Sequence, residues 1–275
     1  MTNKKINKLP NPVINKNMTF YRDDFRKILP SLKNFQTVIV DPPYNINFDY
    51  GGKYKDNIRP DDYKKLMFDV LKLSYKSTKK DSSLFLINYP QIIAELFETI
   101  KTTDWKIHQW ISWVYPSNIG HSDNKFTTSH RSILWLTKDN PKLLFNKETN
   151  PKGISKEEFI SYKPKVNIDS VTQPYKNPTD KRVRKLIASG KKGTHLYNWW
   201  EINLVKNVSK DKELYANQIP NEVLKRLILV TTDKRNKVLD PMCGTGSTVV
   251  AAHREGRVGV GVDLNSELRK IWRKL

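Results

Sequence analysis

The chain has 275 residues, 37% of them hydrophobic, and a formal net charge of +21 at pH 7, so it can bury a sizeable core and suits nucleic acid better than an acidic partner. It holds neither an apolar run long enough to span a membrane nor the apolar segment of a secretory signal, which predicts a cytoplasmic protein. Its single cysteine, Cys243, excludes a disulfide scaffold, and no Cys/His group has zinc-site spacing, so we expect no metal ion.

Strand and helix patterns alternate through the first half of the chain, after a polar and basic segment (1–17) that we expect to be a flexible tail. Hydrophobic periodicity predicts strands over 18–22, 37–40, 83–88, 105–114 and 132–137. The same analysis predicts helices over 23–32, 61–77 and 91–100, the first of them stopped near Pro30.

The character of the sequence changes at about residue 139, where apolar runs become sparse and Lys, Asn and Pro accumulate up to about residue 212. We interpret 139–212 as an insertion between two parts of one domain (18–138 and 213–275). After it the alternation returns, with helices predicted over 220–232, 246–255 and 265–274 and strands over 237–240 and 258–262. Such alternation predicts an α/β fold with a doubly wound, mostly parallel sheet.

The first candidate motif is DPPY, residues 41–44, which directly follows the apolar run TVIV. Two consecutive prolines cannot continue a strand ladder, but they stiffen a turn and fix its backbone. An acid and a backbone carbonyl in such a turn can accept hydrogen bonds from an amino group, and Tyr44 offers a flat face to a base. The alternative is a purely structural role, with a helix-capping aspartate before an ordinary proline turn.

The second candidate motif is DPMCGTGST, residues 240–248, between a predicted strand and a predicted helix. Its glycines allow a ligand close to the backbone at a helix N-terminus, and Asp263, which ends the next strand, is placed to bind ribose hydroxyls. The motif lacks the lysine of a P-loop and the third glycine of a dinucleotide fingerprint. Because parallel strands end at the same edge of a sheet, we expect the two motifs to converge on one pocket.

Together these segments resemble, in order, the S-adenosylmethionine-dependent DNA amino-methyltransferases in which the catalytic motif precedes the cofactor motif. The matching segments are YRDDFRKIL, DPPY, SHRSILWLTK, NQIPNEVLKRLI, DPMCGTGST and GVDLN, which span nearly the whole chain. The resemblance implies a Rossmann-like, circularly permuted methyltransferase domain with an inserted target-recognition region. Met242, Ile219 and Arg131 depart from the family pattern, which usually has Phe, Lys and an acid there.

The resemblance also implies roles for individual residues. The catalytic residues would be Asp41, Pro42, Pro43 and Tyr44, which would hold the amine of a flipped-out adenine while Tyr44 stacks on its ring. The residues around S-adenosylmethionine would be Asp41, Asn217, Gln218, Asp240, Met242, Cys243, Gly244, Gly246, Ser247, Asp263 and Asn265. Those around the target base or DNA would be Asp24, Tyr44, His130 and Arg131. In the insertion, basic residues suit DNA phosphates by their charge: Lys181, Arg182, Arg184, Lys185, Lys191 and Lys192.

Several alternatives stay open. Asp24, and the pair Asn217 and Gln218, could simply cap helices, and 139–212 could be a solvated, lysine-rich surface. The expected activity is adenine-N6 methylation of a specific DNA sequence in a restriction-modification system. A cytosine-N4 enzyme, an RNA or protein methyltransferase and a catalytically silent DNA-binding subunit are the rivals. DNA is the expected partner, and a homodimer and a cognate restriction endonuclease are further expectations from the resemblance.

Overall fold

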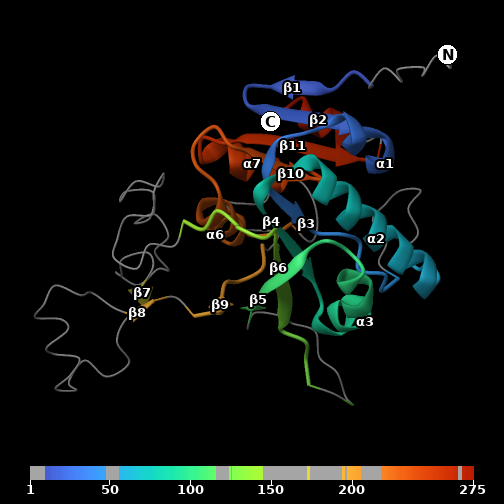
Figure 1. The fold of residues 1–275 in the computed structure, drawn as a ribbon, viewed down its shortest axis with the longest axis vertical. Helices are drawn as coiled ribbons and strands as arrows, with labels where there is room; N and C mark the ends of the chain where they lie inside the picture. The colour runs from blue at the N-terminus through green and yellow to red at the C-terminus, as the bar shows by residue number, and fades with distance from the viewer. Residues whose placement is uncertain are drawn as a thin grey trace, which may run out of the picture.

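The computed structural model describes residues 10–47, 56–115, 124, 126–144, 172–173, 194–195, 197–205, 218–265 and 268–275. In this part of the chain, one sheet of nine strands has the order β1-β2-β11-β10-β3-β4-β6-β5-β9 (Figure 1). Its strands are β1 (Val13–Asn15), β2 (Met18–Arg22), β3 (Phe35–Val40), β4 (Thr78–Asn88), β5 (Lys106–Val114), β6 (His130–Thr137), β9 (Trp199–Glu201), β10 (Lys237–Asp240) and β11 (Val258–Asp263). A separate pair consists of β7 (Thr172–Gln173) and β8 (Thr194–His195).

The predicted mostly parallel sheet is confirmed. Strands β2, β11, β10, β3 and β4 pair in parallel, one after the other. Strand β6 runs antiparallel to both β4 and β5, and β1 runs antiparallel to β2. The carboxyl ends of the parallel strands therefore lie at one edge of the sheet, next to the beginning of β6.

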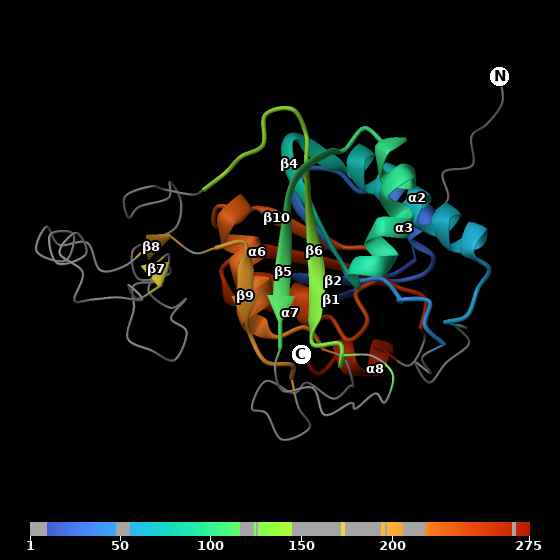
Figure 2. The same cartoon turned by 90° about the horizontal axis from the view of Figure 1, so that it is seen from below.

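Helices cover both faces of the sheet (Figure 2). They are α1 (Phe25–Ile28), α2 (Pro60–Ser77), α3 (Pro90–Lys101), α6 (Asn221–Thr231), α7 (Ser247–Arg254) and α8 (Leu268–Trp272), with a 3-10 turn at Leu29–Ser31. Side chains alternate along β3: Val38 and Val40 pack with α1, α2 and α3, whereas Ile39 packs with α6 and α7. A sheet buried on both faces explains why its strands read as continuous apolar runs.

The predicted helices and strands are confirmed in order, with bounds that shift by up to five residues. The strands that were not predicted lie in segments without long apolar runs. Residues Val13–Asn15 of the expected flexible tail pair with β2 as strand β1, so the prediction was wrong for this segment. Within the described residues, no helix is both long and apolar enough to cross a membrane.

The expected insertion rejoins the main sheet through β9, which the sequence did not predict. Trp199 pairs with Ser112 of β5, and the Ile202 amide donates to the Val114 carbonyl at 2.9 Å. The Trp113 indole donates to the Ile202 carbonyl at 2.7 Å. At the start of the insertion, the Leu144 amide donates to the Val230 carbonyl at 2.8 Å. Both ends of the insertion are therefore fixed to the domain.

Candidate active site

The two candidate motifs lie at the same edge of the sheet. Asp41 follows β3 directly, Asp240 ends the neighbouring strand β10, and Asp263 ends β11 beside it. The negative charge of Asp41 contributes to raising the pKa of Asp240, so the two carboxyl groups are close enough to interact. The predicted convergence of the strand ends is confirmed.

The DPPY turn is held by hydrogen bonds on both sides. The Tyr44 hydroxyl donates to Asp41 Oδ1 at 2.6 Å. The Pro43 carbonyl accepts a hydrogen bond of 2.8 Å from the Tyr63 hydroxyl of α2, and Asn88 Nδ2 donates to that hydroxyl at 3.0 Å. Asn88 ends β4, so the relay ties the turn to the strand beside β3 and fixes its backbone.

The chain after Tyr44 is closed by a clasp around Asp56. The amides of Asn45 and Ile46 donate to the Asp56 carboxylate at 2.7 and 3.1 Å. The Asn45 side chain exchanges two hydrogen bonds with the backbone of Ile58. Asn45 has a φ of 58°, a conformation that asparagine tolerates better than most residues. The clasp joins the two ends of segment 48–55, which lies outside the described residues.

Burial controls the titration of the catalytic candidate. Desolvation raises the pKa of Asp41 to about 6, against the opposing effects of the Arg131 charge and the Tyr44 hydrogen bond. Asp41 is therefore ionised near pH 7, and an ionised carboxylate accepts hydrogen bonds without donating any. It can accept a hydrogen from an amino group placed against it.

The glycine-containing loop has the geometry of a ligand-binding turn. Gly246, with a φ of 94°, precedes Ser247, the first residue of α7. Gly244 has a φ of 49°, and no described atom lies within 4 Å of the place that a Cβ would take. The Met242 amide donates to Asp240 Oδ1 at 3.1 Å, and desolvation raises the pKa of Asp240 to about 7. Gly244 thus leaves open space for a ligand next to the backbone.

Asp263 joins this loop to the end of β11. Its Oδ2 accepts a hydrogen bond from the Gly244 amide, and its Oδ1 accepts one from the Asn265 amide, both at 2.9 Å. The Leu264 amide adds a third backbone hydrogen bond, so these contacts use only part of the acceptor capacity of the carboxylate. The open space beside Gly244 and the remaining acceptor capacity of Asp263 fit the nucleoside part of S-adenosylmethionine.

The remaining cofactor candidates are less directly placed. Cys243 is buried with its Sγ against the backbone of Gly261, where an added Cβ would lie 2.6 Å from it, so it packs rather than reacts. Met242 is half-buried. Gln218 lies just before α6, and Asn217 is outside the described residues. Ile219, where relatives usually have lysine, is buried in the core.

The candidates for the base or DNA separate into two groups. Asp24 caps α1 by accepting a hydrogen bond of 2.8 Å from the Arg26 amide, which is the structural alternative given for it above. His130 and Arg131 begin β6, and Arg131 is buried beside Tyr44. The basic candidates of the insertion lie outside the described residues: Lys181, Arg182, Arg184, Lys185, Lys191 and Lys192.

Sequence reasoning missed the supporting residues Tyr63, Asn88 and Asp56. Tyr63 lies on the buried face of α2, and a buried tyrosine in an apolar helix face gives no sign in the sequence of its hydroxyl partner. Asn88 could have been found from the sequence, because it is a polar residue at the end of an apolar strand. Asp41, which directly follows the apolar run TVIV, is in a similar position. Asp56 pairs with residues ten and eleven positions earlier, and no local pattern marks such a clasp.

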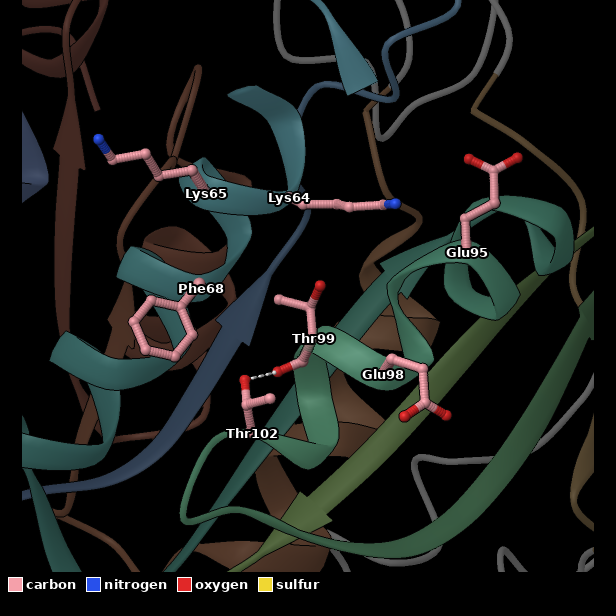
Figure 3. Close-up of a pocket in the computed structure, with 7 residues that line it drawn as sticks. All are labelled: Lys64, Lys65, Phe68, Glu95, Glu98, Thr99 and Thr102. Carbon is pink, nitrogen blue, oxygen red and sulfur yellow. Dashed lines mark hydrogen bonds between the residues drawn. The ribbon is translucent and has the colours of Figure 1, made fainter. Parts of the chain in front are cut away.

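A separate groove of about 410 Å³ lies between α2 and α3 (Figure 3). It is lined by Lys64, Lys65, Phe68, Glu95, Glu98, Thr99 and Thr102. None of these residues belongs to either motif: the two lysines come from α2 and the two glutamates from α3. We therefore place the candidate active site at the strand ends and not in this groove.

Comparison with known proteins supports this assignment. A family model described as DNA methylase, of the N6/N4 methyltransferase type, matches residues 35–274. The chain belongs to the N6/N4 DNA methylase family. Family membership confirms the expected methyl donor, S-adenosylmethionine.

Two curated relatives of this DNA methylase are similar over most of its length. The type II methyltransferase M.HpaI of Haemophilus parainfluenzae is 24% identical over 245 residues, which cover 87% of this chain and 68% of the relative. The DNA adenine methyltransferase YhdJ of Escherichia coli is 24% identical over 240 residues, which cover 85% and 73%.

Solved structures confirm the expected methyltransferase fold. The M1.HpyAVI complex with S-adenosylmethionine has a TM-score of 0.61 at 15% identity and covers 94% of this chain and 98% of that one. The cytosine-N4-specific PvuII DNA methyltransferase has a TM-score of 0.66 at 14% identity, with 98% and 90% covered. At such low identity these likenesses concern the fold alone.

Proposed function

We propose that this DNA methylase transfers a methyl group from S-adenosylmethionine to the N6 amino group of a flipped-out adenine in a specific DNA sequence. The observation that carries the proposal is the Asp41 carboxylate, held by the Tyr44 hydroxyl at the strand edge that also carries Asp240 and Asp263. The rigid DPPY turn places this carboxylate where it can bind an amine. A motif that begins with aspartate favours adenine. The name of YhdJ, a DNA adenine methyltransferase, agrees with this choice.

The chemical task is to make a weak nucleophile reactive. The lone pair of an adenine N6 group is delocalised into the ring, so the nitrogen attacks poorly while it stays planar. Asp41 and the Pro42 carbonyl would each accept one of its hydrogens and let the nitrogen become pyramidal. Because both acceptors are fixed in advance, positioning and electrostatics supply most of the acceleration. The Asp41 carboxylate can take up a proton near neutral pH, which the transfer releases.

The loop residues 240–247 and Asp263 would hold the cofactor. S-adenosylmethionine supplies an electrophilic methyl group when bound. Asp263 would accept from the ribose hydroxyls, and Gly244 would let the ligand lie against the backbone. Met242 would pack on the adenine ring of the cofactor, where relatives usually use phenylalanine. Gln218 would contribute a polar contact to the amino-acid end.

Cytosine-N4 methylation is the main alternative. The PvuII methyltransferase, which is cytosine-N4-specific, shares this fold. The exocyclic amine of cytosine needs the same two acceptors, so the geometry of the turn suits both bases. The distinction rests on the resemblance, in which cytosine-N4 enzymes usually begin the motif with serine. An RNA or protein substrate, or a silent DNA-binding subunit, fits the motif order and the intact acids less well.

DNA contacts would come from the basic insertion. The net charge of +21 suits a polyanion, and Tyr197 and Trp199 stack at a centroid distance of 6.1 Å with their side chains partly exposed at β9. Type II methyltransferases are among the relatives, which supports a restriction-modification role. A cognate endonuclease that acts on the same site is part of the proposal. A cytoplasmic location and a homodimer complete the proposal.

The proposal is tested by product analysis. Purified protein is incubated with unmethylated DNA and S-adenosylmethionine, and the digested nucleosides are identified by mass spectrometry. We expect N6-methyldeoxyadenosine from the wild type and from Asp62→Ala, a control at an exposed aspartate of α2, and none from Asp41→Ala. N4-methyldeoxycytidine would show that the leading aspartate was misinterpreted. Cofactor binding without any DNA product would show that the substrate is not DNA.

A further inference from the structure

Arg131 is a buried cation in a box of aromatic rings. Its side chain is 3% exposed at the start of β6. The centre of its guanidinium group lies 4.8 Å from the ring centroid of Tyr44 and 5.4 Å from that of Trp113. The rings of Tyr89 and Tyr115 follow at 5.7 and 5.9 Å. Rings and the nearby Asp41 charge therefore hold this cation.

Hydrogen bonds hold it only in part, through the Tyr115 side chain. Arg131 Nε and Nη1 are both buried and have no hydrogen-bond partner among the described residues. Lys138, directly after the same strand, provides the contrast: it too lies over a tyrosine ring, Tyr75, at 4.0 Å, but its Nζ donates to two carbonyls. Buried donors without partners are unfavourable, so the Arg131 position has a cost that the Lys138 position lacks.

The ring of Tyr44 offers no free face to another group. Its side chain is 4% exposed, its hydroxyl is bound to Asp41, and Tyr89 meets it edge to face at a centroid distance of 5.2 Å. Under the proposed function, the target amine must reach Asp41 and the base must lie against Tyr44. A base can stack there only if a group that now covers the ring moves. Arg131 is the covering group with unsatisfied donors.

We propose that the Arg131 guanidinium occupies the place of the target base on Tyr44 and that an incoming base displaces it. A guanidinium is flat and delocalised and stacks on aromatic rings much as a base does. When it leaves, its unpaired donors gain water or a backbone phosphate of the flipped nucleotide, and the base takes over the ring contact. The exchange replaces one stacked group by another, so the pocket stays filled in both states. This inference rests on the proposed function and concerns how its pocket opens.

The test measures how well a free nucleoside enters the pocket. The probe is 2-aminopurine deoxyriboside, whose fluorescence falls when it stacks on an aromatic ring. Saturating S-adenosylhomocysteine keeps it out of the cofactor site. We expect Arg131→Ala to bind the probe roughly ten-fold more tightly than the wild type, because the competing cation–π contact is gone. Adding Tyr44→Ala should abolish the gain.

Two further variants keep the test decisive. Lys138→Met removes a buried cation from the end of the same strand and should leave probe binding unchanged. Arg131→Met replaces the charged side chain by a long uncharged one, and it serves as the test variant if Arg131→Ala does not fold. It should also bind the probe more tightly than the wild type. Thermal unfolding reports which variants are folded.

Two results would overturn the proposal. Unchanged probe binding in a folded Arg131 variant would show that the guanidinium does not compete with a base. Weaker binding would show that Arg131 contacts the base instead of making way for it. If the wild type methylates DNA and either result is found, only this inference fails. If the wild type methylates no DNA, the proposed function fails whatever the probe shows.

Discussion

The Tyr44 hydroxyl donates a hydrogen bond of 2.6 Å to the Asp41 carboxylate, so the first and last residues of the DPPY turn act on each other directly. The bond orients the carboxylate and stabilises its ionised form, since it lowers the pKa of Asp41 against the effect of burial. Tyr44 therefore has a polar task besides any contact of its ring with a base.

Tyr44→Phe separates these two tasks. The ring stays, but Asp41 loses its donor, so we expect kcat to fall roughly ten-fold with little change in the affinity for DNA. Steady-state kinetics on unmethylated DNA provide the measurement. Tyr44→Ala serves as the comparison and should impair DNA affinity as well. Equal effects of the two variants on both parameters would contradict the separation.

The dependence of activity on pH should report Asp41. Its pKa of about 6 lies above the usual range, so the carboxyl group becomes protonated as the pH falls through that value. A protonated carboxyl group loses acceptor capacity towards the amine, and kcat should fall about ten-fold per pH unit below about pH 6. In Tyr44→Phe the acidic limb should move to higher pH. An acidic limb that stays in place in this variant would speak against the assignment.

Stability should fall between about pH 4 and pH 7 through Asp240. Burial raises the pKa of this carboxyl group from 3.8 in the unfolded chain to about 7 in the fold. Within this window the folded state binds more protons than the unfolded state, so the free energy of unfolding decreases as the pH rises. We expect the unfolding temperature of Asp240→Asn to depend less on pH than that of the wild type between about pH 4 and pH 7. A slope identical to that of the wild type would exclude Asp240 as its source.

Two glycines with positive φ provide a matched pair for the cofactor loop. Gly244→Ala and Gly256→Ala should each cost about 1 kcal/mol, because alanine is strained in the left-handed region. The methyl group at residue 244 would fill the open space beside the loop, whereas residue 256 lies just beyond α7, next to Lys234. Isothermal titration should show weaker S-adenosylmethionine binding only for Gly244→Ala. Equal loss in both variants would indicate a general effect on stability.

The relay from Asn88 through Tyr63 to Pro43 should act on turnover. Tyr63→Phe leaves the Pro43 carbonyl and the Asn88 amide without their partner, at a cost of about 1 to 3 kcal/mol in stability. A loosened turn should lower kcat several-fold while the dissociation constant of the cofactor stays the same. Calorimetry and initial rates together check this. A change in cofactor affinity alone would contradict a role in positioning the turn.

The sequence was sufficient for the features that depend on neighbours along the chain. The segment around Asp240 shows a strand, a glycine turn and a helix in immediate succession, and Asp263 ends the next apolar run. Since consecutive parallel strands end at one edge, their convergence with DPPY followed from topology. Most helices and strands were predictable for the same reason, because burial on both faces leaves long apolar runs.

The surroundings of Arg131, which depend on the pairing of the antiparallel strand β6, could not be predicted. Its placement beside β4 brings Arg131 into the same neighbourhood as Asn88 and the DPPY turn, although the chain separates Arg131 from Asp41 by 90 residues. In the sequence, only the family resemblance assigned Arg131 to the target base or DNA, at a position where relatives usually have an acid. Its burial among four aromatic rings comes from strand pairing, and no periodicity encodes it.

The two attachment points of the insertion have a consequence for how such enzymes diversify. Leu144 is tied to the end of α6, and Ile202 is tied to β5, by backbone hydrogen bonds that do not depend on side-chain identity. Under the proposed function, the sequence between Leu144 and β9 could therefore be exchanged for another of different length and composition while β9 and the catalytic edge keep their support. If the insertion recognises the target as proposed, a new recognition sequence would require no change at Asp41 or Asp263.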